Sequence, residues 1–276
     1  MRKPSRWLLG CLLVFVYCIG CGAEAPGKGW FFVQLTDTHW GARDGVSLTR
    51  KAVEMINALP VKIEFVTVTG DLFQDSIRKE NVVEEGRAAM KELKVPVYYV
   101  PGNHDLLKAD MANTAGLFEK DFGPLNRKVE IQGVNCLFLC TEMMEGETRS
   151  PGDVERSWIE NTLRGSHLPV LLFMHRPPIR DMINGSDGEV SWDDVYDTRW
   201  EALFDRHPEI KAVFAGHFHR DEVFWIGAVP VHVAPALARF WDRQPAFRLC
   251  QYKGGRINYW TLYPERTERA AAGGGR

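Results

Sequence analysis

The chain has 276 residues, of which 45% are hydrophobic and 25% are charged, and this is the composition of an ordinary globular protein of one or two domains. Its length is sufficient for a large buried core. The formal net charge is -2 and the isoelectric point is near 6.5, so the composition excludes the basic surface that a nucleic-acid polymer would need in a partner.

The first 21 residues are expected to be an export signal and not part of the fold. Basic residues at positions 2, 3 and 6 precede an apolar run over residues 7–20, which is too short to span a membrane comfortably. A positive segment followed by a short apolar segment is typical of a secretory signal peptide. The protein is therefore predicted to be exported.

Three outcomes of this export signal stay open. Residues 18–21 (Cys-Ile-Gly-Cys) resemble the lipobox of bacterial lipoproteins, in which the residue at Cys21 becomes lipidated, although Cys18 stands where Leu is usual. Lipidation would hold the protein on a bacterial membrane in the periplasm or cell envelope. Ala23 and Ala25 also fit a cleavage site for soluble export, although Pro26 would hinder that cut. The third outcome is an uncleaved anchor.

The rest of the chain is expected to form one domain. Residues 22–29 read as a linker, residues 30–263 as the domain, and residues 264–276 as a disordered tail. Three cysteines remain in the domain, at Cys136, Cys140 and Cys250. They are odd in number and lie in apolar runs, which favours buried thiols over a disulfide framework.

Strands and helices alternate in the first half of this domain. Strands are predicted over residues 30–35, 63–69 and 97–100. A helix over 47–59, capped by Ser47, separates the first two, and a helix capped by Asp75 or Ser76 and reaching about residue 93 separates the last two. This order favours an α/β fold with parallel strands at its centre.

The second half is predicted to contain a helix over 111–122, a hairpin or a pair of successive strands over 128–131 and 135–139, and a helix that Asp153 caps. Strands over 168–174 and 210–215 follow, with a helix over 199–206 between them. Residues 176–198 are rich in Pro, Gly, Asp and Trp and are a candidate lid over a site. Residues 222–263 are expected to form antiparallel strands.

Side chains able to bind metal follow five of these strands at the point where each strand ends. They are Asp37 and His39, Asp71, Asn103 and His104, His175, and His217 and His219. A single aspartate or histidine after a strand is usually a turn residue or a satisfied histidine. Because the carboxyl ends of parallel strands meet at one sheet edge, the joint pattern indicates a common site.

Oxygen and nitrogen donors without a thiolate suit borderline divalent metals such as Mn, Fe or Zn. Seven of the donors exceed what one tetrahedral ion needs, which favours two ions that share a carboxylate. Such a centre binds a phosphoryl oxygen, generates hydroxide and stabilises an in-line displacement. The residues therefore indicate hydrolysis of a phosphoester.

The motifs resemble those of the calcineurin-like metallophosphoesterases, in the same order along the chain. The resemblance implies a four-layer αββα sandwich with mixed sheets. It implies one ion on Asp37, His39, Asp71 and His219, and a second on Asp71, Asn103, His175 and His217, with Asp71 bridging. It also implies that His104 is catalytic, contacting phosphate and assisting the leaving group. His-Arg-Pro-Pro at 175–178 resembles the bacterial cyclic-nucleotide and glycerophosphodiester phosphodiesterase branch.

The chain departs from the family pattern at one position. Many members carry an aspartate three residues after the bridging one, where it orients the catalytic histidine. Here Gln74 occupies that position and Asp75 follows it, so either the turn is longer or His104 lacks this partner. Asp105 is expected to support the loop as a turn residue, not to bind metal.

Further contacts to the substrate are open. Arg176 follows a predicted ligand and is a candidate for binding phosphate, or it is an ordinary solvated or ion-paired arginine. Arg43 and Asp44 are expected to border the site. Four aromatic residues are candidates for stacking on a base or sugar, with simple packing as the alternative. The four are Trp40, Trp192, Phe240 and Trp241.

The predicted function is metal-dependent hydrolysis of a phosphodiester, such as a cyclic nucleotide or a glycerophosphodiester, by attack of metal-bound hydroxide. One alternative is a phosphomonoesterase with the same dinuclear site. The other is a non-catalytic scaffold that binds metal, against which the complete set of seven donors argues.

Overall fold

The computed structural model describes residues 29–144, 151–181, 198–241 and 243–265. Four predictions fall outside these residues wholly or in large part: the signal peptide with Cys21, the linker, the tail, and the stretch 182–197 of the candidate lid, which includes Trp192.

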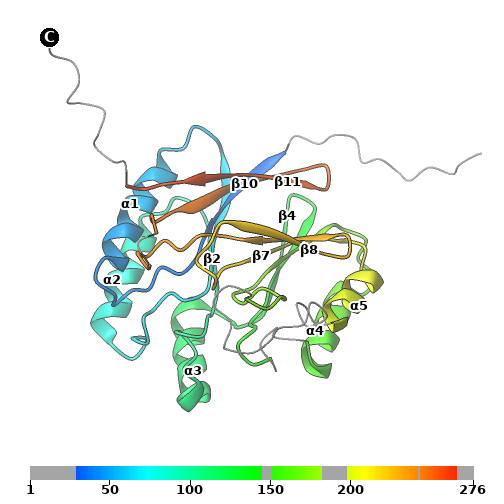
Figure 1. The fold of residues 1–276 in the computed structure, drawn as a ribbon, viewed down its shortest axis with the longest axis horizontal. Coiled ribbons are helices and arrows are strands. Elements are labelled where there is room, and N and C mark those ends of the chain that lie inside the picture. Colours follow the sequence, from blue (N-terminus) through cyan, green and yellow to red (C-terminus); the bar gives the residue numbers. More distant parts are fainter. Residues whose placement is uncertain (1–28, 145–150, 182–197, 242, 266–276) are drawn as a thin grey trace, which may run out of the picture.

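The first sheet has five strands in the order β11-β10-β1-β2-β3. β1 (Trp30–Leu35), β2 (Ile63–Thr69) and β3 (Val97–Val100) run parallel, and α1 (Gly45–Asn57) and α2 (Glu80–Lys91) connect them (Figure 1). The last two strands of the domain, β10 (Phe247–Lys253) and β11 (Arg256–Leu262), return to this sheet as an antiparallel pair beside β1. The predicted order of the first half is confirmed.

The second sheet has six strands in the order β4-β5-β6-β7-β9-β8. Its strands are β4 (Arg127–Ile131), β5 (Val134–Phe138), β6 (Val170–Phe173), β7 (Ile210–Ala215), β8 (Glu222–Ile226) and β9 (Val229–Val233). The hairpin of β4 and β5 is confirmed. The prediction of antiparallel strands after residue 222 is wrong for β9, which pairs parallel with β7 and antiparallel only with β8.

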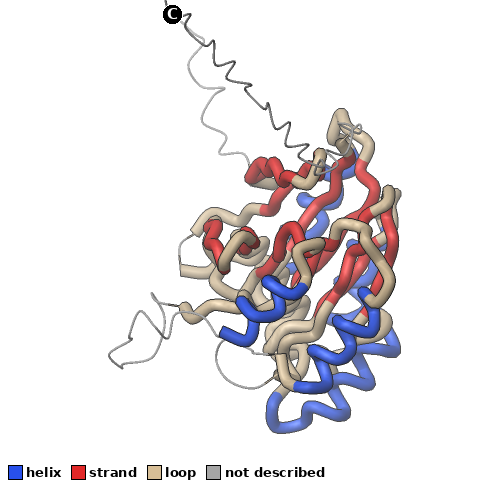
Figure 2. The backbone as a smooth tube through the Cα atoms, turned by 90° about the vertical axis from the view of Figure 1, so that its right-hand side faces the viewer, coloured by secondary structure: helices blue, strands red, loops and turns tan. Residues whose placement is uncertain are grey.

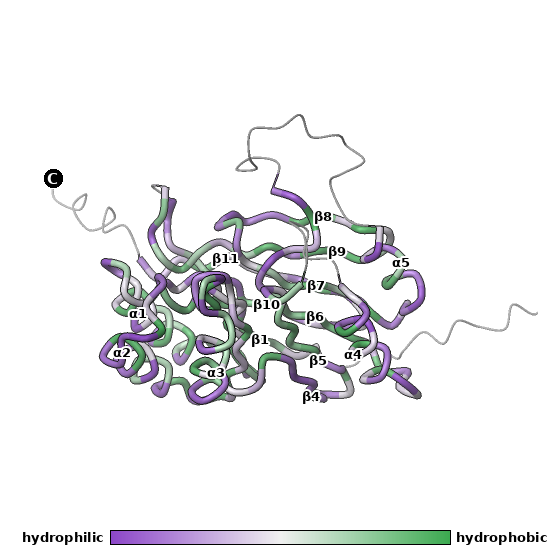
Figure 3. The backbone as a smooth tube through the Cα atoms, turned by 90° about the horizontal axis from the view of Figure 1, so that it is seen from below, coloured by the Kyte–Doolittle hydropathy of each residue, from purple (hydrophilic) through white to green (hydrophobic). Residues whose placement is uncertain are grey.

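Three hydrophobic clusters show a four-layer αββα sandwich, as the resemblance implied. One lies between the first sheet and α1, α2 and α3 (Met111–Phe122), which follows the short 3-10 helix η1 (Lys108–Asp110). Another lies between the second sheet and α4 (Asp153–Leu163) and α5 (Thr198–Arg206). The third fills the space between the sheets. Figure 2 shows helices outside the strands, and Figure 3 shows hydrophobic residues gathered along the inner strands.

Phenylalanines hold the two sheets together. Phe32 stacks on Phe65 with ring centroids 5.1 Å apart, and Phe173 stacks on Phe214 at 5.1 Å. Phe32 also meets the edge of Phe214 across the sheets at 5.1 Å. Each fully buried ring contributes about 1.5–3 kcal/mol. This packing fixes the strand ends of the two sheets relative to each other.

The helix caps expected from the sequence are wrong. α1 begins at Gly45 after Asp44, and Ser47 lies inside it, donating to the carbonyl oxygen of Asp44. α2 begins at Glu80, not at Asp75 or Ser76. Asp153 is the first residue of α4, after Gly152 at the cap position. Residues 75 and 76 serve the site instead, as described below.

The three cysteines of the domain are free and buried, as predicted. Burial raises the pKa of the Cys250 thiol to about 12, which keeps it protonated. In the part of the chain that the structure describes, none of the helices is long and apolar enough to cross a bilayer.

Candidate metal centre

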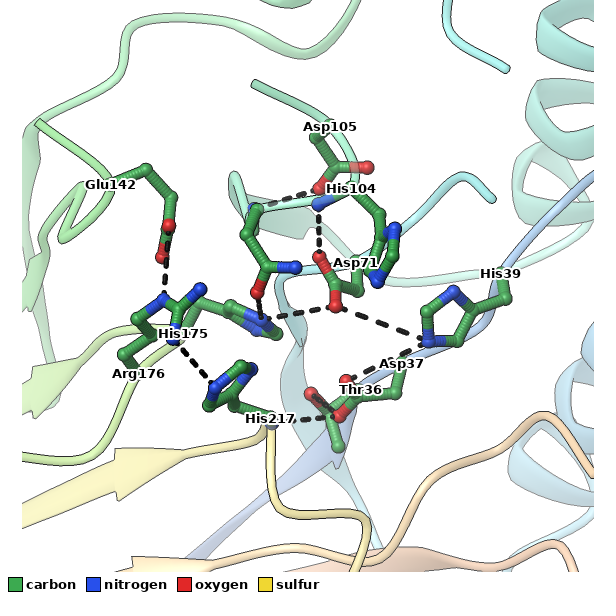
Figure 4. Close-up of polar contacts among 12 residues, drawn as sticks. Thr36, Asp37, His39, Asp71, His104, Asp105, Glu142, His175, Arg176 and His217 are labelled. Atoms are coloured by element: carbon green, nitrogen blue, oxygen red, sulfur yellow. Dashed lines mark hydrogen bonds and ion pairs between the residues drawn. The ribbon is translucent and has the colours of Figure 1, made fainter. Parts of the chain in front are cut away.

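The eight predicted donors lie together at the carboxyl ends of β1, β2, β3, β6 and β7 (Figure 4 shows most of them). The loops that follow the strands hydrogen-bond to each other. The backbone N–H of Asp37 donates to the carbonyl oxygen of Gly70 at 2.9 Å. The backbone N–H of His39 donates to the backbone carbonyl oxygen of Asp71 at 3.0 Å. The first two motifs are therefore held side by side by backbone bonds that continue beyond the sheet.

Four buried donors form the first group: Asp37, His39, Asp71 and His219. Nε2 of His219 lies 3.0 Å from Oδ1 of Asp37 and 3.4 Å from Nε2 of His39. Nε2 of His39 lies 4.0 Å from Oδ2 of Asp71. One atom from each of the four residues lies within 4.8 Å of the others, which is compatible with ligands around a single ion.

The second group contains Asp71, His175 and His217, with Asn103 beside them. Nε2 of His175 lies 3.2 Å from Oδ2 of Asp71 and 3.2 Å from Oδ1 of Asn103. Nδ1 of His175 bonds the carbonyl oxygen of Thr69 at 2.9 Å, so Nε2 points at the other donors. Asp71 belongs to both groups, as expected for a bridging carboxylate.

The backbone of these loops is strained. Eight described residues other than glycine have positive φ, and five of them are predicted ligands: Asp37, His39, Asp71, His217 and His219. Side chains disfavour this conformation, and such strain concentrates at functional sites. Gly70, also at positive φ, admits no side chain, because a Cβ there would lie 2.3 Å from Nδ1 of His175.

The electrostatics of the centre keep both aspartates ionised. Burial alone would raise the pKa of Asp37, but the neighbouring His219 and His175 outweigh burial and lower the pKa to about 2. The pKa of Asp71 is lowered further, since burial is opposed by His175 and His39. Burial lowers the pKa of His39 to about 4, which leaves a neutral imidazole. His175 differs: burial would lower its pKa, but Asp71 and Asp37 outweigh burial and raise the pKa to about 10. Anionic carboxylates and neutral imidazoles are the forms that bind metal, so an ion at His175 must displace its proton.

The residues fit two divalent ions. Asp37 and Asp71 bring two negative charges into a buried site, which costs free energy unless a cation balances them. Within the described residues, Oδ1 of Asp37 accepts no hydrogen bond in good geometry, although it faces two imidazoles. Imidazole, carboxylate and amide donors suit Mn, Fe or Zn. The two groups, joined at Asp71, offer a place for each ion.

His104 has the carboxylate partner that the family pattern left in doubt. Its Nδ1 lies 2.9 Å from Oδ1 of Asp75, and Asp75 reaches it from a backbone with φ of 49°. The turn is thus one residue longer than in the pattern. The backbone N–H of His104 donates to Oδ1 of Asp71 at 2.8 Å, which ties the histidine to the bridging carboxylate.

Asp105 supports the loop, as predicted. Its carboxylate accepts backbone N–H bonds from Leu72 at 3.1 Å, Phe73 at 2.9 Å and Gly102 at 2.8 Å. Both oxygens are therefore used in joining the loops after β2 and β3.

Arg176 bonds protein groups on both sides. Its Nη1 lies 2.8 Å from Nε2 of His217, and its Nε donates to Oε2 of Glu142 at 3.1 Å (Figure 4). Sequence reasoning did not single out Glu142, which lies in the loop after β5. No local pattern marks it, because its partner is 34 residues away. A buried acid beside a predicted ligand becomes visible only when β5 and β6 pair.

The aromatic candidates separate into two kinds. Trp40 is fully buried and donates to Oγ1 of Thr49 at 3.0 Å, so it is a core residue. Phe240 lies over the centre, with ring centroids 4.6 Å from His39 and 5.0 Å from His219. Trp241 is 62% exposed and its ring centroid is 5.0 Å from that of His219. Arg43 is exposed beside the first motif.

A two-sheet sandwich with two overlapping groups of carboxylate and imidazole donors at one edge defines a dinuclear metallohydrolase fold. Residues 32–221 match the family model of the calcineurin-like phosphoesterases. This match spans well over half of the chain. The chain therefore belongs to the calcineurin-like phosphoesterase family, whose members use a dinuclear divalent metal site.

Relatives in the family differ in activity. The chain is 30% identical over 189 residues to the serine/threonine-protein phosphatase CPPED1 of Danio rerio, a match that covers 64% of this chain and 60% of that protein. It is 25% identical over 209 residues to a probable cyclic nucleotide phosphodiesterase of Fibrobacter succinogenes, covering 74% of this chain and 78% of that protein. The chain thus spans less than two thirds of the phosphatase's length.

The fold also matches a crystal structure of a dimetal phosphatase from Danio rerio. The TM-score is 0.57 at 14% identity, and the match covers 86% of this chain and 99% of that one. At this identity the comparison shows the shared fold alone.

Proposed function

We propose that the protein hydrolyses a phosphodiester with two divalent metal ions bound at the candidate metal centre. The observation that carries the proposal is the convergence of seven side chains able to bind metal at one edge of the two-sheet sandwich, with Asp71 in both groups. Bound ions would supply Lewis acidity toward a phosphoryl oxygen and a nucleophile derived from water.

The chain's own residues have distinct tasks in this proposal. Asp37 is held for binding by Oγ1 of Thr36, which donates to its Oδ2 at 2.7 Å, and by the backbone N–H of His217 at 3.1 Å. His104 is partly exposed at the edge of the centre, and Asp75 holds its ring. In that position it donates a hydrogen bond to a phosphoryl oxygen or a proton to the leaving alkoxide.

Space beside the first group supports a diester. A cavity of about 410 Å³ adjoins His219, with Phe240 and Arg243 in its wall. Arg243 is fixed by Nη1, which donates to the carbonyl oxygen of His219 at 3.0 Å. The cavity has room for the second ester group, and the 25% identity to a probable cyclic nucleotide phosphodiesterase supports this substrate class.

A hydrolysis panel tests the proposal. The substrates are bis-p-nitrophenyl phosphate, p-nitrophenyl phosphate, a 3′,5′-cyclic nucleotide and a glycerophosphodiester, each with Mn, Fe, Zn or chelator. We expect metal-dependent turnover, with diesters cleaved at least as efficiently as the monoester. A strong preference for the monoester under every metal would favour the phosphatase alternative, which the 30% identity to a phosphatase also supports. Metal binding without turnover on any substrate would favour the scaffold alternative.

We also propose that the protein is exported and lipidated at Cys21, on the basis of the basic and apolar leader. Cys21→Ala should leave the precursor uncleaved or move it out of the detergent phase, since lipid chains hold it there. Cys11→Ala, in the leader but outside residues 18–21, is the matched control. Mass spectrometry of the mature amino terminus that finds an unmodified residue beyond Cys21 would exclude lipidation.

A further inference from the structure

The contact between Arg176 and His217 determines which nitrogen of His217 carries a proton. An arginine guanidinium only donates hydrogen bonds. Nε2 of His217, 2.8 Å from Nη1 of Arg176, must therefore accept, and the ring proton must lie on Nδ1. A neutral imidazole has one lone pair in the plane of its ring, and Arg176 uses it.

A metal ion needs the same lone pair. Whichever nitrogen binds the ion, the other must carry the proton of the neutral ring, and that N–H cannot accept from Arg176. The guanidinium is also a cation next to the place that the second ion would take. Binding of an ion by His217 therefore requires the bond to Arg176 to break.

We infer that the hydrogen bonding of Arg176 responds to metal. Arg176 donates to His217 before the second ion binds, and when that ion breaks this bond the guanidinium turns to donate to the substrate's phosphoryl oxygen. This inference rests on the proposed function and names a positioning group for the same reaction. A planar guanidinium suits a phosphoryl group, to which it donates two parallel bonds.

The surroundings of Arg176 allow the tip of the side chain to move while its base stays fixed. Its backbone N–H donates to Oγ1 of Thr141 at 3.2 Å, and its Nε donates to Glu142 at 3.1 Å. The side chain of Glu142 is only 2% exposed, so this carboxylate is a fixed pivot. The side chain of Arg176 is 20% exposed, so part of it reaches solvent. Rotation about the pivot exchanges one partner of the tip for another.

Metal titration by calorimetry tests the inference in Arg176→Met. Arg176 competes with the ion for His217 through a charge-assisted hydrogen bond. Its removal should therefore increase the affinity for the second equivalent of Mn²⁺ or Zn²⁺ by about 10- to 100-fold. The same variant, loaded with metal, should bind inorganic phosphate about tenfold more weakly. If Arg176 had a purely structural role, the substitution would weaken the binding of both the second ion and phosphate.

Two further variants keep this test sharp. Arg176→Met removes the cation beside the buried Glu142, and this acid could then attract metal or destabilise the fold. The double variant Arg176→Met with Glu142→Gln removes that acid, and the tightening should persist in it. Arg206→Met on α5, which removes an exposed arginine paired with Glu160, is the control and should change neither affinity.

The outcomes separate the two proposals. If the wild-type protein binds fewer than two ions, the proposed function is wrong, because it requires a dinuclear metal centre. If it binds two ions with the same affinities in the wild type and in both Arg176 variants, the inference about Arg176 is wrong and the proposed function stands.

Discussion

Asp71 is the residue on which both halves of the candidate metal centre depend. Its Oδ2 faces His39 and His175, and its Oδ1 accepts from the backbone N–H of His104. Gly102 allows this approach, because a Cβ at that position would lie 2.3 Å from Oδ1 of Asp71. One carboxylate thus joins both groups of candidate ligands and the loop that carries His104.

Asp71→Asn keeps the shape of the side chain and removes its charge. We expect fewer than two equivalents of bound metal by elemental analysis and turnover lower by about 10³-fold, since a shared anionic ligand is lost. Asp205→Asn, at an exposed aspartate of α5, should change neither quantity. Two bound equivalents with normal activity would remove Asp71 from the centre.

His104→Ala separates chemistry from metal binding. The histidine lies beside the ligands and is held by Asp75, so the variant should keep its metal and lose about 10²–10⁴-fold in turnover of alkyl esters. If proton donation is the main role, p-nitrophenyl esters should lose much less, because nitrophenolate leaves without help. Asp75→Asn should show the same pattern more weakly. Unchanged turnover of alkyl esters would contradict the assignment.

At the scale of residues, the donors and the supporting role of Asp105 were predictable, whereas the contact of Asp75 stayed one of two alternatives and Glu142 was not singled out. A donor such as Asp37 or His175 follows its strand directly, so local sequence places it at the sheet edge. Asp75 and Glu142 act on residues 29 and 34 positions away. Their roles depend on which strands become neighbours, and local patterns carry no information about that.

At the scale of elements, the same loop residues explain the wrong helix starts. Ser76 resembles a cap, but its Oγ donates to the carbonyl oxygen of Trp40 at 2.7 Å, and Asp75 holds His104. Both polar side chains join the loop after β2 to other parts of the site. The helix therefore starts only at Glu80, after the chain has left the centre.

The packing of α2 against the first motif gives a matched pair of variants. A Cβ at Gly86 in α2 would lie 2.1 Å from Cε3 of Trp40, whose indole is held by Thr49. Gly86→Ala should therefore destabilise the fold by about 1–3 kcal/mol in urea unfolding. It should also weaken metal binding, since Trp40 follows His39.

Gly116→Ala in α3 is the control for this pair. The site has open space within 4 Å of the added Cβ, and the residue is exposed, so the variant should stabilise the fold by about 0.5–1 kcal/mol. Equal effects of the two substitutions would show that helix propensity, not the contact with Trp40, decides the result at Gly86.

At the scale of the whole molecule, the centre depends on the sandwich that places five strand ends together. The first sheet supplies Asp37, Asp71 and Asn103, and the second supplies the histidines that follow β6 and β7. The parallel strands were predictable from their alternation with helices. The parallel pairing of β9 with β7 was not, because β8 lies between them in the chain and no local pattern encodes which strand of the second sheet β9 joins.

His232 of β9 is a buried histidine that packs against aromatic rings of both sheets. The residue is 5% exposed, its ring stacks on Phe214 at 5.1 Å, and neither ring nitrogen has a hydrogen-bond partner among the described residues. Burial and then the nearby Arg248 lower its pKa from 6.5 to about 4. The folded protein therefore holds this imidazole neutral where the unfolded chain protonates it.

This difference predicts how stability depends on pH. Above pH 6.5 the ring is neutral in both states, and its contribution is fully present. Between pH 6.5 and about 4 only the unfolded chain takes up the proton, so stability falls with falling pH by up to about 3 kcal/mol. Below that range both states are protonated and this loss ends.

His232→Phe should remove this part of the pH dependence while keeping the stacked ring. We expect the free energy of unfolding, measured by urea titration of the metal-free protein, to be nearly that of the wild type at pH 7 and to exceed it progressively as the pH falls from 6.5 toward 4. The metal-free form is used because metal binding itself depends on pH, and protonation of the free ligand side chains affects wild type and variant alike and cancels in their difference. His167→Gln, at an exposed histidine, should run parallel to the wild type. If the difference between His232→Phe and the wild type stays constant over this range, the buried imidazole does not couple folding to protons.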